Sequence, residues 1–148
     1  KTMSEINQAH PDVCAVISVN KGLVTQASAA IPVVPLYFAI LYKVMKKAGN
    51  HENCIQQIAR LFTQKLYTPT GFQTDENGFI RMDDYELLPE IQEEVKKCWK
   101  AVTTDTVNQY CDIDGYWEDF YHMFGFRYED IDYTQDVDAD VEIDGVVM

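Results

Sequence analysis

A single run of small and β-branched apolar residues most constrains what this chain can fold into. Residues 13–19 read Val-Cys-Ala-Val-Ile-Ser-Val and lead into the turn residues Asn20, Lys21 and Gly22. An unbroken apolar run of this length is typical of a strand covered on both faces, as in parallel sheets packed between helices. No other segment is as convincing a strand, and one strand cannot make a sheet. We therefore expect its neighbours to come from outside these residues.

Most of the remaining chain has helical periodicity. Residues 33–47 are apolar nearly all round and end in lysines, which suits the negative end of a helix dipole, and Gly49 ends the helix. A helix over residues 51–66 carries an apolar stripe that we expect to be buried. Its members are Ile55, Ile58, Ala59, Phe62 and Leu66.

A further helix opens at Pro89 with acidic residues and closes with lysines near residue 100, the order that a helix dipole favours. Its stripe is Ile91, Val95, Cys98, Trp99 and Val102. Shorter helical pieces are predicted at residues 2–9, 104–110 and 114–124. The alternating Asp/Val segment 128–148 is predicted to be a loosely docked acidic tail.

The charge balance excludes one class of partner. The chain has 12 Lys+Arg against 24 Asp+Glu, a net charge of −12, whereas nucleic-acid backbones are held by clustered cations. We therefore predict no nucleic-acid role. The charge is uneven, because residues 1–49 carry five cations and two anions, so an anionic ligand would be tolerated there.

The segment from Gly22 to Tyr42 is 21 residues without a charge, long enough by itself to cross a bilayer. Polar residues interrupt it, however, and Pro32 and Pro35 would leave helix carbonyls unpaired in lipid. The segment is predicted to be a core helix, with no transmembrane segment in the chain.

Two acidic patterns resemble metal sites only in part. Residues 73–84 have the spacing of a calcium-binding loop, but Gln73 stands first and Asp84 replaces the bidentate Glu at the twelfth place. Asn77-Gly78 is also a common hairpin turn. The run Asp136-x-Asp138-x-Asp140 lacks both the glycine and the glutamate. We predict no metal site.

The junction between the strand and the following helix is the best candidate for a ligand site. In doubly wound sheets, ligands bind beyond the carboxyl ends of strands. Gly22 lets a ligand approach the backbone, and Leu23 and Val24 can offer only main-chain N–H and C=O groups, which match the donor and acceptor of a carboxamide. Thr25 can offer a hydroxyl to a phosphate. An ordinary helix cap at Thr25 explains the pattern equally well.

The residues around this junction form a long and unusual string. Residues 18–37 read Ser-Val-Asn-Lys-Gly-Leu-Val-Thr-Gln-Ala-Ser-Ala-Ala-Ile-Pro-Val-Val-Pro-Leu-Tyr. This string resembles the trans-2-enoyl-CoA (enoyl-acyl-carrier-protein) reductase family. The order of later segments is similar to that family too: residues 41–46, 51–55, 75–84 and 124–133. The resemblance covers nearly the whole chain but only the C-terminal part of a family member.

The resemblance implies an α/β fold: the C-terminal, mainly helical part of a Rossmann-like (short-chain-dehydrogenase-like) fold, with one buried parallel strand and a helical substrate-binding extension. It implies an NADH-dependent reductase that passes a hydride to the β-carbon of an enoyl-CoA or enoyl-acyl-carrier-protein thioester, with a Tyr that stabilises the enolate. Leu23, Val24 and Thr25 match the segment that contacts the nicotinamide end of NADH. The following helix matches the wall of the acyl pocket, where Val34, Phe38 and Tyr42 share one face.

The family's Gly-rich turn and its catalytic Tyr and Lys lie upstream of the matched part, so no catalytic residue is assigned here. Tyr37 and Lys46 have the right spacing, but in one helix they would lie on opposite faces, about 13.5 Å apart along the axis. Catalysis would then require the N-terminal portion of the same reductase.

Residues 1–127 are predicted to form the C-terminal part of a reductase domain, and residues 128–148 the tail. Within that domain we expect the last sheet strand at about 13–19 and the pocket helices within 26–124. The alternative is a non-catalytic structural or interaction subunit derived from that family. The expected compartment is the cytoplasm for a bacterial protein, with the mitochondrion open for a eukaryotic one.

Overall fold

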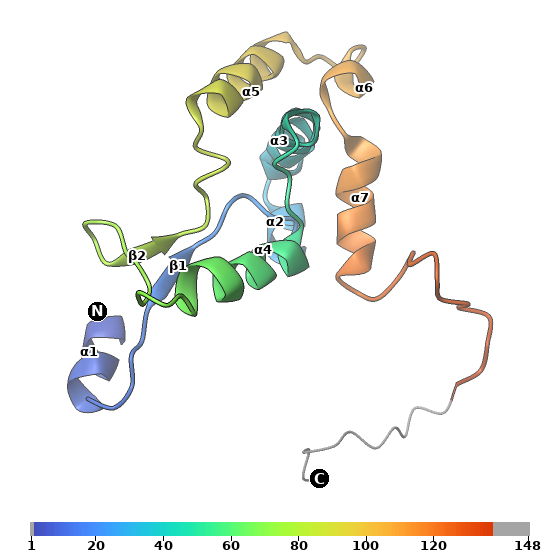
Figure 1. Ribbon diagram of the computed structural model, residues 1–148. Helices are drawn as coiled ribbons and strands as arrows, with labels where there is room; N and C mark the ends of the chain where they lie inside the picture. Colours follow the sequence, from blue (N-terminus) through green and yellow to red (C-terminus); the bar gives the residue numbers. More distant parts are fainter. Residues whose placement is uncertain (1, 138–148) are drawn as a thin grey trace.

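The computed structural model describes residues 2–137 and consists mainly of helices (Figure 1). An N-terminal helix, α1 (Thr2–Ala9), precedes strand β1 (Ile17–Val19). Within the described residues, β1 pairs with one strand, β2 (Phe79–Arg81). The pairing is parallel, with Ser18 opposite Ile80. Since a parallel neighbour requires a crossover connection, the helices between the two strands supply it.

The strand is parallel as predicted, but three details of the prediction are wrong. Residues 13–16 are not part of β1, and the Asn7 side chain both donates to the Ala15 carbonyl and accepts from its N–H. A neighbouring strand lies inside the chain, where the turn Asn77-Gly78 suggested a local hairpin. Ile17 is 41% exposed, so the described residues do not cover β1 on both faces. A three-residue strand such as β2 is too short to show a period in sequence.

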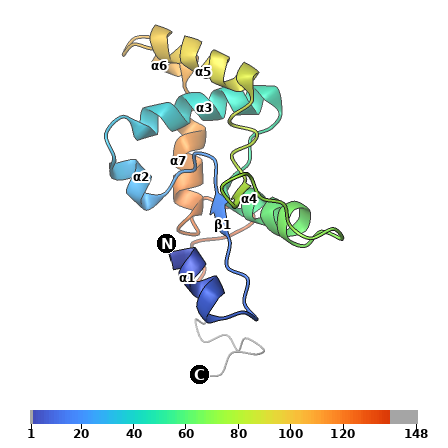
Figure 2. The same cartoon turned by 90° about the vertical axis from the view of Figure 1, so that its left-hand side faces the viewer.

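Helix α3 (Val34–Ala48) forms the centre of the molecule, between α5 (Pro89–Ala101) and α7 (Ile113–His122) (Figures 1 and 2). Its bounds confirm the predicted helix. Pro35 lies in the first turn, where its missing N–H costs nothing, and Gly49 ends the helix with a left-handed φ of 76°. Ile40, Leu41, Tyr42 and Met45 are completely buried.

The neighbours of α3 complete the core. Ile91 and Val95 of α5 and Tyr116 of α7 are buried against it. Cys98 and Val102 also pack against this core, which confirms the predicted stripe on α5 apart from Trp99. Trp99, in the second half, is 39% exposed. The short helices α2 (Gln26–Ala30) and α6 (Val107–Tyr110) connect these elements.

The predicted helix over residues 51–66 is present in part, but its polar face is buried and most of the apolar stripe that is predicted to be buried is exposed. It consists of α4 (Cys54–Arg60), which continues as a π-helix, η1 (Leu61–Leu66). Ile55 and Ile58 are 71% and 47% exposed, whereas Gln57 and Arg60 are 2% and 6% exposed. The polar face turns inward because the Arg60 guanidinium pairs with Glu52 and Asp84.

The segment after α7 is held by two tyrosines. The Tyr133 hydroxyl donates to the Gly125 carbonyl at 2.7 Å and accepts the Tyr128 N–H at 2.9 Å. The rest of the predicted tail, residues 138–148, lies outside the described residues. In the described part of the chain, no helix is both long and apolar enough to cross a membrane.

Candidate functional site

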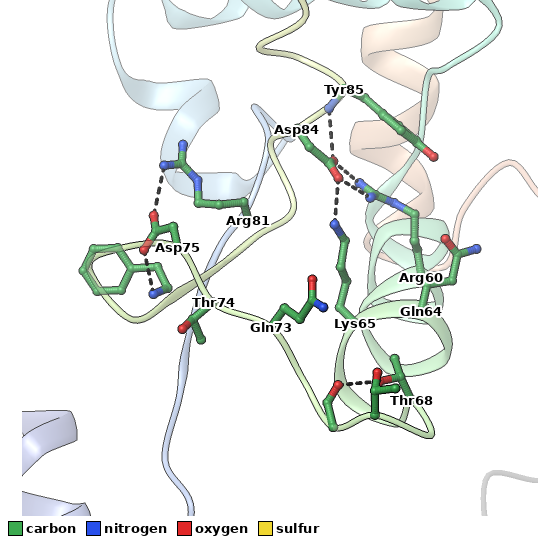
Figure 3. A pocket seen from close by; sticks show the side chains of 13 residues that line it. Arg60, Gln64, Lys65, Thr68, Gln73, Thr74, Asp75, Arg81, Asp84 and Tyr85 are labelled. Carbon is green, nitrogen blue, oxygen red and sulfur yellow. Dashed lines mark hydrogen bonds and ion pairs between the residues drawn. The ribbon is translucent and has the colours of Figure 1, made fainter.

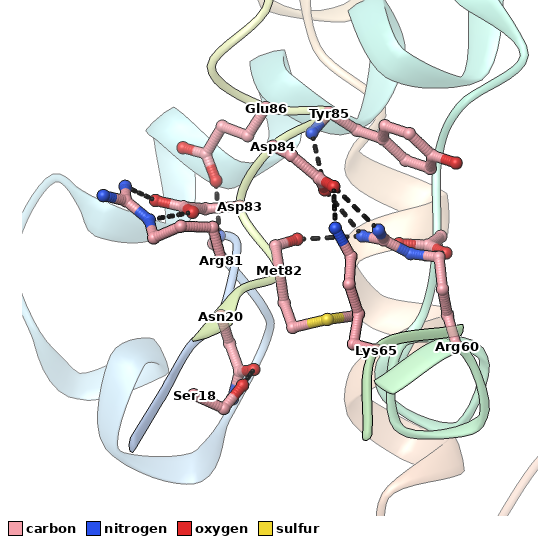
Figure 4. A network of polar contacts seen from close by, with 12 residues as sticks. Ser18, Asn20, Arg60, Lys65, Arg81, Met82, Asp83, Asp84, Tyr85 and Glu86 are labelled. Atoms are coloured by element: carbon pink, nitrogen blue, oxygen red, sulfur yellow. Dashed lines mark hydrogen bonds and ion pairs between the residues drawn. The ribbon is translucent and has the colours of Figure 1, made fainter. Parts of the chain in front are cut away.

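The turn that follows β1 is fixed to the rest of the molecule by Glu86, which lies in the segment before α5. Its Oε2 atom accepts the Gly22 N–H at 2.6 Å, and its Oε1 atom accepts the Tyr37 hydroxyl at 2.6 Å. Burial and the neighbouring carboxylate raise the pKa of Tyr37 to about 12, so this hydroxyl keeps its proton. Figure 4 shows Glu86 in the segment that follows β2.

Gly22 is required by the close approach of α3. A Cβ added at this position would lie 2.6 Å from a ring carbon of Phe38 and 3.3 Å from a methyl carbon of Leu41. Both neighbours are buried and cannot easily move. The glycine thus serves packing against α3, in addition to any approach of a ligand.

The next two residues use only half of their main-chain groups within the described residues. The Val24 N–H donates to the Tyr42 hydroxyl at 3.0 Å, and the Leu23 carbonyl lies 3.4 Å from the Ser28 hydroxyl, which shares its one proton with the nearer Thr25 carbonyl at 3.0 Å. The Leu23 N–H and the Val24 carbonyl have no hydrogen bond there. One donor and one acceptor on adjacent residues are what a carboxamide ligand needs.

Thr25 is a helix cap. Its backbone is extended, its hydroxyl oxygen accepts the Ser28 N–H at 3.0 Å, and the Ser28 hydroxyl accepts the Thr25 N–H at 2.8 Å, which together form a capping box. The sequence left two roles open for Thr25, a helix cap and a hydroxyl donor to a phosphate, and the structure shows the cap. Capping uses an oxygen lone pair, so the hydroxyl proton of this exposed residue can still be donated.

The three residues predicted to form an acyl-pocket wall lie on one face of α3 but differ in exposure. Val34 is half-buried, Phe38 is 8% exposed and Tyr42 is completely buried. The Phe38 and Tyr42 rings are stacked, with their centroids 6.4 Å apart. Tyr42 also contacts the turn after β1 through its hydroxyl, a second role that the helical spacing could not predict.

Tyr37 and Lys46 contact different partners, as the helical spacing predicts. The Tyr37 hydroxyl donates to Glu86, whereas the Lys46 ammonium pairs with Asp112 at 2.6 Å. Asp112 is the residue that caps α7. Both side chains therefore hold this chain's own elements together.

A cavity that the sequence did not reveal lies between α4–η1 and the segment around β2 (Figure 3). Its volume is about 550 Å³. Arg60 and Lys65 both pair with Asp84 (Figures 3 and 4). Arg81 pairs with Asp75 (Figure 3) and with Asp83 (Figure 4). The cations are thus compensated by carboxylates. No local sequence motif predicts this cavity, because the residues that line it, within 60–85, come together only when the chain folds.

The arrangement defines a class of protein. Two parallel strands joined through helices form part of a Rossmann-like α/β fold, a class in which ligands bind beyond the carboxyl ends of the strands.

Comparisons with known proteins identify the family. Residues 1–67 match the family model described as the trans-2-enoyl-CoA reductase catalytic region, and residues 74–137 match the enoyl reductase FAD binding domain. The chain belongs to the trans-2-enoyl-CoA and enoyl-acyl-carrier-protein reductase family, as its sequence predicts.

Individual relatives agree. An enoyl-[acyl-carrier-protein] reductase [NADH] of Cytophaga hutchinsonii is 50% identical over 133 residues, 90% of this chain and 34% of that protein. A trans-2-enoyl-CoA reductase [NADH] of Ruminiclostridium cellulolyticum is 48% identical over 132 residues, 89% of this chain and 33% of that protein. The crystal structure of Treponema denticola trans-2-enoyl-CoA reductase in complex with NAD matches with a TM-score of 0.83 and 46% identity, over 92% of this chain and 34% of that one. The chain thus spans about a third of the length of these relatives.

The name of the second family model implies a flavin, which the described residues do not fit. A flavin dinucleotide needs donors for its pyrophosphate, commonly a glycine-rich turn before a helix. Within residues 74–137 no such turn precedes a helix, and the two longer helices open with acidic residues, Glu90 in α5 and Asp114 in α7. These residues therefore do not form a flavin site.

Proposed function

We propose that this chain forms the C-terminal portion of an NADH-dependent reductase that reduces the C2=C3 double bond of enoyl-CoA or enoyl-acyl-carrier-protein thioesters in fatty-acid synthesis. Its share of the work is part of the NADH site and of the acyl pocket. The N-terminal portion of the same reductase supplies the catalytic Tyr and Lys. The compartment follows the source: the cytoplasm for a bacterial protein, with the mitochondrion open for a eukaryotic one.

The observation that carries this proposal is the pair of unpaired main-chain groups at the turn after β1. The Leu23 N–H and the Val24 carbonyl can bind the carboxamide of a nicotinamide through one acceptor and one donor. Thr25 can donate its hydroxyl proton to the adjoining phosphate while its oxygen caps α2. NADH supplies the hydride when bound; these residues hold and orient its nicotinamide end.

The acyl chain of the substrate would lie along the N-terminal half of α3. Val34 has exposed surface to offer, whereas Phe38 and Tyr42 support that wall from behind, because both are buried. Apolar contact with Val34 would orient the thioester without any polar contribution from this helix.

A coupled assay tests the proposal. The chain expressed together with its N-terminal portion should oxidise NADH in the presence of crotonyl-CoA, and the 148-residue chain alone should not. In the complex, Thr25→Ala should weaken NADH binding by about tenfold, the loss of one hydrogen bond to a charged group. Thr63→Ala, which changes an exposed threonine of η1, is the matched control. Unchanged affinity in Thr25→Ala would remove this residue from the cofactor site.

A non-catalytic interaction subunit is the second candidate, because Ile55, Ile58 and Phe62 expose a continuous apolar face on α4 and η1. Such a face favours contact with another polypeptide. An assembly with the N-terminal portion that forms but has no NADH oxidation would favour this candidate over the enzyme.

A further inference from the structure

Lys21, which directly precedes Gly22, is almost completely buried, which is rare for a lysine. It is 2% exposed, and its ammonium donates to the Gly22 carbonyl at 3.2 Å. The same ammonium lies 5.1 Å from the centre of the Tyr42 ring, on which it makes a cation–π contact. No carboxylate of the described residues lies within ion-pair distance of it.

The charges around Lys21 come from every element packed against it. Glu86 precedes α5, Asp119 lies on α7, Glu52 precedes α4, and the cation Arg60 ends α4. Burial outweighs the attraction of the three carboxylates and lowers the pKa of Lys21 to about 8. A buried ammonium without a direct ion pair costs folding free energy, and an apolar side chain of the same length would be more stable there.

Tyr42 holds the other end of the same turn. Its hydroxyl accepts the Val24 N–H at 3.0 Å, and its ring carries the Lys21 ammonium. Desolvation raises the pKa of Tyr42, so the hydroxyl is protonated and neutral. Lys21 and Tyr42 together therefore occupy the Gly22 carbonyl and the Val24 N–H, the two main-chain groups that flank the unpaired Leu23 N–H.

We propose that Lys21 and Tyr42 are a positioning pair that fixes the Gly22–Val24 turn so that the Leu23 N–H and the Val24 carbonyl are held ready for the nicotinamide carboxamide. The proposal rests on the proposed function. Neither side chain touches the ligand; each acts through a main-chain hydrogen bond. Burying the ammonium costs folding free energy, but it keeps the binding turn rigid. A rigid, pre-formed site loses less conformational entropy when the ligand binds.

Two variants test the pair in the complete reductase that contains this chain. Lys21→Met removes the ammonium but keeps the length of the side chain, and Tyr42→Phe removes only the hydroxyl. Lys97→Met, which changes a lysine whose side chain is 71% exposed, is the matched control. The measurements are the dissociation constant for NADH, the thermal unfolding midpoint, and hydrogen exchange of the peptide that covers residues 20–28.

Each of the two variants should weaken NADH binding by about tenfold, the effect of one lost hydrogen bond to the turn, and should speed exchange in residues 20–28. Lys21→Met should keep or raise the unfolding midpoint, which a merely structural lysine would not do. Unchanged exchange and affinity in both variants would overturn the pair. A wild-type protein without affinity for NADH would instead overturn the proposed function. The role of the pair toward nicotinamide would then fail too, even if the variants change hydrogen exchange in residues 20–28.

Discussion

The sequence predicts that helices α3 and α4 both bury their apolar side chains, and yet the two helices behave in opposite ways. In α3 the apolar side chains are buried, and Ile40 has no exposed surface. In α4 the apolar side chains face outward, with Ile55 71% exposed, while Gln57 and Arg60 are buried. An apolar stripe therefore predicts burial only where the chain itself provides a surface to cover it: α5 and α7 cover α3, and no described element covers the stripe on α4.

The polar face of α4 gives the largest test of this contrast. Arg60→Met should lower the free energy of unfolding of the chain by about 3–5 kcal/mol, since it leaves the largely buried carboxylate of Glu52 without its partner, while Asp84 keeps only Lys65. Urea unfolding measures this change. A loss below about 1 kcal/mol would show that α4 is not anchored by its polar face.

The apolar faces of the two helices should respond very differently to the same truncation. Ile40→Ala in α3 should cost about 2–5 kcal/mol, because it opens a cavity in the core. Ile55→Ala in α4 should change the free energy of unfolding by no more than about 0.5 kcal/mol. Equal losses in the two variants, measured by urea unfolding of the chain, would contradict the observed inversion.

The connection between the two helices supplies a smaller, pH-dependent test. His51 packs against the Tyr42 ring with centroids 4.4 Å apart, and burial lowers its pKa to about 4. Between pH 6.5 and 4 the unfolded chain binds a proton that the folded chain refuses, so stability falls as the pH falls, by up to about 3 kcal/mol. The loss begins near the unfolded pKa and is complete near the folded one.

The matched variant is His51→Phe, which keeps an aromatic ring without a titratable group. The difference in free energy of unfolding between the wild-type chain and this variant should fall as the pH is lowered through that window. A difference that stays constant from pH 7 to 4 would show that His51 is free to take up a proton in the folded state.

The sequence points to part of the candidate site but not to the residues that support it. The string from Ser18 to Tyr37 identified the family and pointed to Leu23, Val24 and Thr25, because the resemblance is carried by consecutive residues. The capping role of Thr25 is predictable, since a cap is a local pattern. Glu86, which binds the Gly22 N–H from 64 residues away, has no local pattern that announces it.

By itself, the sequence determined α3 and its glycine stop, the parallel character of β1 and the reductase family, because helix periodicity, a continuous apolar strand and a long family string are all read from neighbouring residues. Only the tertiary structure decided that β2 pairs with β1, that α4 turns its polar face inward and that Lys21 is buried against Tyr42. The physical reason is that distant segments compete for burial and for hydrogen-bond partners. A pattern of neighbouring residues does not show which of these distant partners are available.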